Sequence, residues 1–266
     1  MKIIISHDID HLHWTDHFND FFIPKFIARE SISLIKGHLS RKQYVQRLSL
    51  LKNNRQHRLP ELIKFNKYYS VKPTFFVGLD NALSLSYSKR KALNIIRWLK
   101  NQGFEVGVHG IAFDVEERVN FERKAFAESG FGANGIRMHY LRNSTNTLMH
   151  IANAGYEYDS TLIERRNPFK TADGLVEFPV STMDVYAAAD KVRSYEDIRK
   201  QVEQDIELAV DEGLRYYTVI FHDLYFDPRY HSYYAWYRHL VEYCTMRGYQ
   251  FIDFKTAISE MYGSEA

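Results

Sequence analysis

The chain alternates between short apolar runs and longer segments of helical character. Its first run, residues 2–5, reads Lys-Ile-Ile-Ile, and these β-branched residues are typical of a short buried strand. Further strands are predicted at residues 73–77, 104–108, 135–137, 175–180, 216–221 and 249–252. Helices are predicted at residues 60–69, 88–102, 115–129, 145–154, 195–212 and 231–247.

This alternation of strands and helices predicts parallel strands joined by right-handed crossovers. About seven such units suit a closed or nearly closed barrel better than an open sheet. We therefore predict an α/β fold, a deformed (β/α)7-type barrel, in which residues 1–266 form a single domain. Residues from about 15 to 58 lack strand signals and are predicted to be a helical insert after the first strand.

The helical insert is basic and aromatic. Residues 21–60 hold nine lysines and arginines against Glu30 alone, and Phe18, Phe21, Phe22 and Phe26 fall near helical spacing. A segment of this kind can lie on an anionic membrane surface, here the inner membrane, or hold a nucleotide-sugar diphosphate. The alternative is a helical layer packed against the barrel or a partner chain, with a solvated basic face.

Composition limits the classes of function. The net charge of only +2 argues against a general nucleic-acid binder. Cys244 is the one cysteine, so an internal disulfide is excluded and a reducing compartment is suitable. No signal-peptide pattern precedes the first strand, and no apolar run reaches the roughly 18 residues that span a bilayer. We expect a cytoplasmic protein.

Ionisable residues recur where the predicted strands end, which is where barrels carry their active sites. Asp8 and Asp10 follow the first strand, and strand alternation points both the same way. Buried carboxylates repel each other and resist desolvation, so this pair needs a cation or a catalytic task, unless it caps a solvated turn. The residues at the other strand ends are His109, Arg137, His139, Asp159, His222 and Asp223. Together they predict an active site.

Several motifs carry a family resemblance. They are His7-Asp8-Ile9-Asp10, Lys72-Pro73-Thr74-Phe75-Phe76-Val77, Phe104-Glu105-Val106-Gly107-Val108-His109-Gly110, Gly135-Ile136-Arg137-Met138-His139-Tyr140, Tyr158-Asp159-Ser160-Thr161-Leu162 and Val219-Ile220-Phe221-His222-Asp223. In this order they resemble the polysaccharide deacetylase superfamily, the NodB-homology domain of carbohydrate esterase family 4. With Pro179-Val180-Ser181-Thr182-Met183-Asp184, they look closest to members from bacterial surface-polysaccharide (O-antigen) genes.

The resemblance implies catalytic roles. Asp8 is implied as the base and His222 as the general acid. Arg137 is implied to orient the base, with Asp159 as its ion-pair partner. The backbone N–H at Tyr140 is implied to help hold the oxyanion. Arg142 and Asp223, which neighbour these motifs, are candidates for substrate binding.

The resemblance also implies a metal site, and here the sequence departs from the family. Asp10 and His109 match two ligands, but the position of the family's second metal histidine is Phe113. Three protein ligands plus an open position suit a catalytic divalent metal ion, for which zinc is the candidate. His139, on the same strand face as Arg137, is the first candidate for the third ligand. Asp114 is the second, and a site without a third ligand or a metal remains open.

The function implied is a metal-dependent hydrolase that removes an N- or O-acyl group from a sugar in surface-polysaccharide (O-antigen) biosynthesis. Its substrate would be an acylated, nucleotide- or lipid-linked saccharide. The loss of a ligand at Phe113 favours a second reading, a catalytically inactive carbohydrate-binding relic. A third reading is a metal-independent amidohydrolase acting on a C–N bond.

Overall fold

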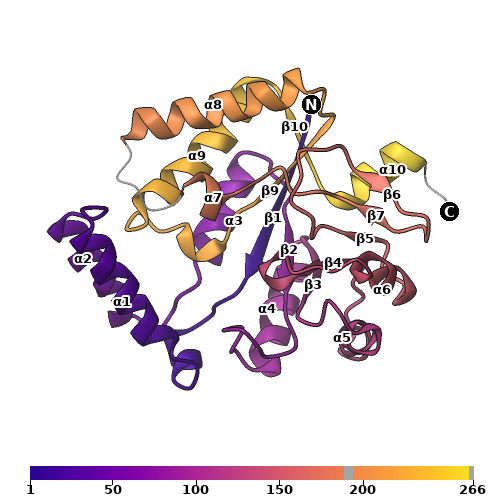
Figure 1. Cartoon of the computed structure of the whole chain (residues 1–266), viewed down its shortest axis with the longest axis horizontal. Helices are drawn as coiled ribbons and strands as arrows, with labels where there is room; N and C mark the ends of the chain where they lie inside the picture. The colour runs from indigo at the N-terminus through magenta and orange to yellow at the C-terminus, as the bar shows by residue number, and fades with distance from the viewer. Residues whose placement is uncertain (189–193, 264–266) are drawn as a thin grey trace.

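One sheet of ten strands runs through the part of the chain that the computed structural model describes, residues 1–188 and 194–263 (Figure 1). The order across it is β6-β7-β5-β4-β3-β2-β1-β9-β8, with β10 paired to β1. Among these pairs only β6 and β7 run antiparallel. The strands are β1 (Lys2–Ile9), β2 (Thr74–Val77), β3 (Glu105–Gly110), β4 (Gly135–Met138), β5 (Tyr158–Asp159), β6 (Phe169–Lys170), β7 (Val176–Glu177), β8 (Thr182–Met183), β9 (Tyr216–Ile220) and β10 (Gln250–Ile252).

The central strand is β1. It pairs with β9 over residues 2–6, with β10 over residues 2–4 and with β2 over residues 6–9. The strand therefore reaches Ile9, beyond the apolar run that predicted it. Polar residues continue the strand because their side chains find buried partners: Ser6 Oγ donates to the Val219 carbonyl at 2.9 Å, and His7 Nδ1 donates to the Phe221 carbonyl at 2.7 Å.

The sheet returns on itself through residues 176–183. The start of this segment, β7, pairs with β5, and its end, β8, pairs with β9. Between them, the Ser181 N–H donates to the Thr218 carbonyl at 2.9 Å. The ring thus runs through β1, β2, β3, β4, β5, the β7–β8 segment and β9, which confirms the predicted deformed (β/α)7-type barrel.

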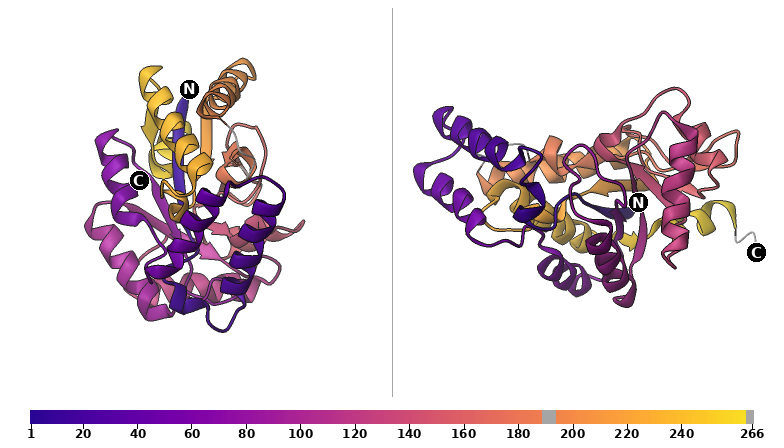
Figure 2. Two further views of the ribbon diagram at one scale, coloured as in Figure 1. Left: turned by 90° about the vertical axis from the view of Figure 1, so that its left-hand side faces the viewer. Right: turned by 90° about the horizontal axis from the view of Figure 1, so that it is seen from below.

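Helices cover the outside of this ring (Figures 1 and 2). Their bounds lie within two residues of the six helices predicted from periodicity. They are α3 (Leu59–Tyr68), α4 (Lys89–Asn101), α5 (Glu116–Glu128), α6 (Thr147–Asn153), α8 (Tyr195–Asp211) and α9 (His231–Met246). Two further helices, α7 (Asp184–Ala187) and α10 (Phe254–Tyr262), were not predicted. Among the described helices, none is long and apolar enough to cross a bilayer.

The insert after β1 is a pair of helices, α1 (Phe22–Ile35) and α2 (Arg41–Leu48), flanked by the 3-10 turns η1 (Trp14–His17) and η2 (Ser49–Lys52). We call residues 21–52 the helical arm; it stands at one corner of the molecule (Figures 1 and 2). Arg47 ties the arm to the barrel. Its Nε donates to the Arg229 carbonyl at 2.6 Å, and its guanidinium lies 4.1 Å from the Tyr230 ring centre.

Close packing inside the ring generates a stability prediction. A Cβ added at Gly135 would lie 2.0 Å from the buried Tyr158 ring, which is itself stacked on Phe254. We expect Gly135→Ala to lower the free energy of unfolding by about 1–3 kcal/mol, measured by urea denaturation. The matched control is Gly132→Ala, where no atom lies within 4 Å. Equal midpoints for the two variants would contradict this packing.

Candidate active site

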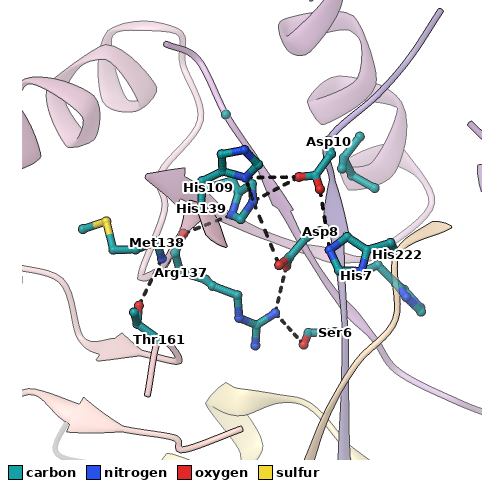
Figure 3. Close-up of polar contacts among 12 residues, drawn as sticks. Ser6, His7, Asp8, Asp10, His109, Arg137, Met138, His139, Thr161 and His222 are labelled. Carbon is teal, nitrogen blue, oxygen red and sulfur yellow. Dashed lines mark hydrogen bonds and ion pairs between the residues drawn. The ribbon is translucent and has the colours of Figure 1, made fainter. Parts of the chain in front are cut away.

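Asp8 and Asp10, at the end of β1, line one cavity of about 260 Å³ at the carboxyl end of the barrel strands. His109 reaches it from β3, His139 from the 3-10 turn η3 (His139–Leu141) after β4, and His222 from the end of β9. Figure 3 shows these side chains converging. Four of the predicted strand ends therefore meet at one site, as the sequence predicts.

Arg137 fixes the ionisation and direction of Asp8. Its Nη1 donates to Asp8 Oδ1 at 2.9 Å and to Ser6 Oγ at 2.7 Å. The guanidinium is fully buried and also donates to the carbonyl and hydroxyl oxygens of Ser160, at 2.8 and 2.7 Å. Burial alone would raise the pKa of Asp8, but the charges of Arg137, His109 and His222 outweigh it and lower this pKa. Asp8 is therefore held as an oriented carboxylate.

The predicted ion pair between Arg137 and Asp159 is replaced by this direct pair with Asp8. Asp159 instead accepts the Thr161 hydroxyl at 2.7 Å and lies beside the buried Glu177, on the opposite face of the sheet from Tyr158. Burial and the neighbouring Asp159 raise the pKa of Glu177 well above its ordinary range, so Glu177 is the neutral member of this acid pair. The correction has a geometric cause: four of the five N–H groups of Arg137 donate to Asp8, Ser6 and Ser160.

Asp10, His109 and His139 form a compact group of possible metal ligands. Asp10 Oδ1 lies 3.2 Å from His109 Nε2 and 3.5 Å from His139 Nδ1, and the two ring nitrogens are 3.0 Å apart. Burial opposes the charge of Asp10, but the two imidazoles hold its pKa well below the ordinary range. Asp10 Oδ1 is nonetheless buried without a hydrogen bond of good geometry among the described residues.

The outer hydrogen bonds of the two imidazoles decide which nitrogens face each other. His109 Nδ1 lies 3.0 Å from the Arg137 carbonyl oxygen, and His139 Nε2 lies 3.1 Å from that of Leu83. A carbonyl only accepts, so these two nitrogens carry the hydrogens. In the neutral rings, His109 Nε2 and His139 Nδ1 then point lone pairs at each other and at Asp10. Three such donors fit a divalent metal ion, with a fourth tetrahedral position left open.

His222 stands on the other side of Asp10, with its Nε2 3.5 Å from Asp10 Oδ2. Its Nδ1 donates to the Asp184 carboxylate at 3.0 Å, and its backbone N–H donates to the same group at 2.6 Å. Burial would lower the pKa of His222, but the charge and hydrogen bond of Asp184 raise it to about 10. A protonated imidazole therefore faces the cavity.

Asp184 is a site residue that sequence reasoning did not assign. It begins α7 directly after β8 and is fully buried. The only signal for it was its place in the Pro179–Asp184 motif. The strand predicted there ended at residue 180, so Asp184 was not recognised as a residue at a strand end.

The backbone turns sharply at the rim where Tyr140 lies. Tyr140 and Leu141 both adopt left-handed conformations, with φ of 57° and 52°, which cost free energy for residues other than glycine. The Tyr140 side chain is 64% exposed and, with Leu141, lines the cavity. An oxyanion-binding role for its N–H stays a prediction.

Comparison with known proteins adds evidence on the fold. No protein-family model and no curated protein sequence matches the chain. A structure assigned as a polysaccharide deacetylase from Mycobacterium smegmatis matches with a TM-score of 0.65 and 17% identity, covering 97% of this chain and 89% of that one. A second, from Pseudomonas aeruginosa PAO1, matches with a TM-score of 0.63 and 14% identity over 99% and 92%.

The chain has the fold of polysaccharide deacetylases. This confirms the predicted resemblance at the level of architecture. The same fold also matches a 4-alpha-glucanotransferase from Thermococcus litoralis, with a TM-score of 0.55 and 13% identity over 98% of this chain and 40% of that one. Because different chemistries share a fold, the activity has to be argued from the site.

On this deacetylase fold, Phe113 and Asp114 lie where the family resemblance placed a second metal histidine. Asp114 is exposed and is not part of the ligand group, whereas His139 is. The Arg142 guanidinium stacks 4.2 Å from the Phe113 ring centre and does not line the cavity. The structure therefore favours His139 over Asp114.

Asp223, the other candidate for substrate binding, is buried at the start of the 3-10 turn η4 (Asp223–Tyr225). Its Oδ2 accepts the Arg58 backbone N–H at 2.9 Å, and it is not among the residues that line the cavity. Burial raises the pKa of Asp223 to about 7. Asp223 is adjacent to His222 in the chain but is not part of the cavity lining. Its carboxylate instead holds the segment before α3 through the Arg58 N–H.

The helical arm adds a wall to the deacetylase barrel. Phe22, Phe26 and Arg29, spaced as one face of a helix, line the cavity together with Tyr225 and Tyr230. The sequence predicted the helical spacing of Phe22 and Phe26 but not their place at the site, because periodicity alone does not say which neighbour a helix face meets.

Proposed function

We propose that the chain is a metal-dependent hydrolase that removes an N- or O-acyl group from a sugar. The observation that supports this most is the convergence of Asp10 Oδ1, His109 Nε2 and His139 Nδ1, with both imidazoles oriented by backbone carbonyls. Two neutral imidazoles would place lone pairs 3.0 Å apart, an arrangement that a divalent ion between them stabilises. Burial alone would lower the pKa of His139, but Asp10 raises it, so a proton takes this place when no metal ion is bound. A bound divalent ion such as zinc would polarise the acyl carbonyl and acidify water.

Each remaining step has a residue suited to it. Asp8, ionised and held by Arg137, takes a proton from the attacking water. The water oxygen bonds to the acyl carbon, and the backbone N–H at Tyr140 helps to stabilise the oxyanion that forms. His222, protonated beside Asp184, donates its Nε2 proton to the leaving amine or alcohol as the carbon–nitrogen or carbon–oxygen bond breaks.

The cavity wall supports a substrate with an anionic group. Arg29 is the one lysine or arginine among the described residues that line the cavity. Its Nε and Nη2 donate to Glu30 Oε1 at 3.1 and 3.0 Å, while Arg47 Nη1 lies 3.4 Å from Glu30 Oε2. Arg29 thus brings a guanidinium to the cavity wall, where it can bind an anionic group. A sugar linked through phosphate, to a nucleotide or a lipid, fits this charge, and we propose that it is an acylated saccharide of surface-polysaccharide (O-antigen) synthesis.

The metal site generates the first functional prediction. Protein purified without chelators should hold about one zinc ion per chain by metal analysis, and EDTA should abolish deacetylation. His139→Ala should lose the zinc, because one of three ligands is removed. The matched control Asp114→Ala should keep it. Activity that survives EDTA in metal-free protein would instead favour a metal-independent amidohydrolase, and absence of both metal and activity would favour a binding relic.

The second functional prediction concerns the proposed acid–base pair, Asp8 and His222. Asp8→Asn and His222→Ala should each lower kcat by about 10²–10⁴-fold, because each removes one proton transfer. Zinc content and the far-UV circular dichroism spectrum report whether site and fold survive the substitution. Full activity in both variants would overturn the assigned roles.

The third functional prediction concerns Arg29 at the cavity wall. Arg29→Gln should raise KM for UDP-N-acetylglucosamine by about tenfold or more, the cost of one charge-assisted hydrogen bond, with KM for free N-acetylglucosamine nearly unchanged. Glu30 keeps Arg47 as its partner, so the arm should stay folded. Arg41→Gln, an exposed arm residue away from the cavity, is the control. Calorimetric binding of both sugars gives the same comparison independently of turnover.

A further inference from the structure

The helical arm has two apolar faces, and only one of them is covered. The inner face of α1 carries Phe26, Glu30 and Ser33, all buried. The outer face places residues 25, 28, 32 and 35 at steps of three and four, which is one stripe along the helix. This stripe reads Lys, Ala, Ile and Ile, and Phe21 precedes it at the N-cap; all five residues are exposed.

The exposure of this stripe is high for large apolar side chains. Phe21 is 72% exposed, Ile32 51% and Ile35 83%. On the neighbouring helix α2, Val45 is 64% exposed. Contiguous apolar groups of this kind on a surface mark a site of interaction with a partner or a membrane.

Charge identifies the kind of partner. Residues 21–52 contain seven lysines and arginines and one acidic residue, Glu30, which is fully buried. The exposed basic residues of the arm include Lys25, which belongs to the stripe, and Lys36, Arg41 and Lys42. Since the whole chain is only +2, the rest of it carries net negative charge, and the positive charge is concentrated on the arm. The surface thus combines apolar side chains with unbalanced positive charge.

A second copy of this chain does not fit that combination, because two arms placed face to face would bring like charges together in a desolvated interface. An anionic lipid surface fits both features: acyl chains accept the Phe and Ile side chains, and phosphate groups neutralise the lysines and arginines. We propose that the outer face of the helical arm docks on an anionic bilayer surface.

The arrangement of α1 gives this docking a consequence for the site. The helix that would lie on lipid also lines the cavity with Phe22, Phe26 and Arg29. Docking would therefore hold the cavity wall close to the lipid headgroups. If the proposed deacetylase function holds, the substrate class that benefits is a lipid-linked saccharide, whose sugar stands at the membrane surface. The docking itself does not depend on catalysis.

The test is co-sedimentation of the full chain with vesicles of phosphatidylcholine alone and of phosphatidylcholine mixed with phosphatidylglycerol. We expect binding to the phosphatidylglycerol vesicles at low salt, little binding to phosphatidylcholine alone, and weaker binding as sodium chloride is added. The double variant Phe21→Ser, Ile35→Ser should bind at least tenfold more weakly. Lys36→Gln with Lys42→Gln should weaken binding and its salt dependence together.

The matched control is Tyr68→Ser with Met246→Ser, two side chains that are 80% and 74% exposed outside the arm. It should bind vesicles like the unsubstituted chain, and urea denaturation checks that all variants are equally folded. Absence of binding to phosphatidylglycerol vesicles at low salt would overturn the proposal, as would an equal loss in the control. So would a dimer, detected by analytical ultracentrifugation, that the Phe21→Ser, Ile35→Ser variant dissociates. None of these results bears on catalysis, which is measured separately.

Discussion

The charges of Asp8 and Asp10 at the end of the central strand constrain the rest of the site. Both carboxylates are taken out of water, so each needs positive charge close by. Arg137 supplies it to Asp8 and binds Ser6 and Ser160 as well, which links β1, β4 and the segment after β5. Removing one member of such a buried pair typically costs 3–5 kcal/mol. The contacts that hold the barrel together at this end therefore also keep Asp8, the proposed base, ionised and oriented.

The histidines near the cavity differ in pKa and hydrogen bonding because their surroundings differ. His222, with Asp184 on its Nδ1, has a pKa raised to about 10 and carries a proton into the cavity. His7, buried against Phe75 and Phe221, has its pKa lowered by desolvation to about 4 and serves as a neutral hydrogen-bonding group. His109 is fixed through its outer nitrogen by a backbone carbonyl. One fold thus holds an acid and a metal-ligand group within one cavity.

The helical arm contributes to the cavity with one face and presents the other to solvent. The deacetylase fold is shared with a glucanotransferase, so the barrel alone does not set the chemistry. The arm adds an aromatic wall and Arg29 to the cavity while presenting a basic, apolar surface on its other side. Both faces belong to α1, so the proposed substrate contact and the proposed docking surface lie on one helix.

The sequence by itself determined the alternation of elements, the barrel class and the strand ends that carry ionisable groups, because periodicity and strand geometry are local properties of the chain. Tertiary structure decided the partners. His139 rather than Asp114 joins Asp10 and His109, since the Leu83 carbonyl, 56 residues away, orients its ring. Arg137 binds Asp8 across 129 residues instead of Asp159, and Asp184 reaches His222 across 38. Such pairings depend on strand register and loop paths, which no local pattern of residues contains.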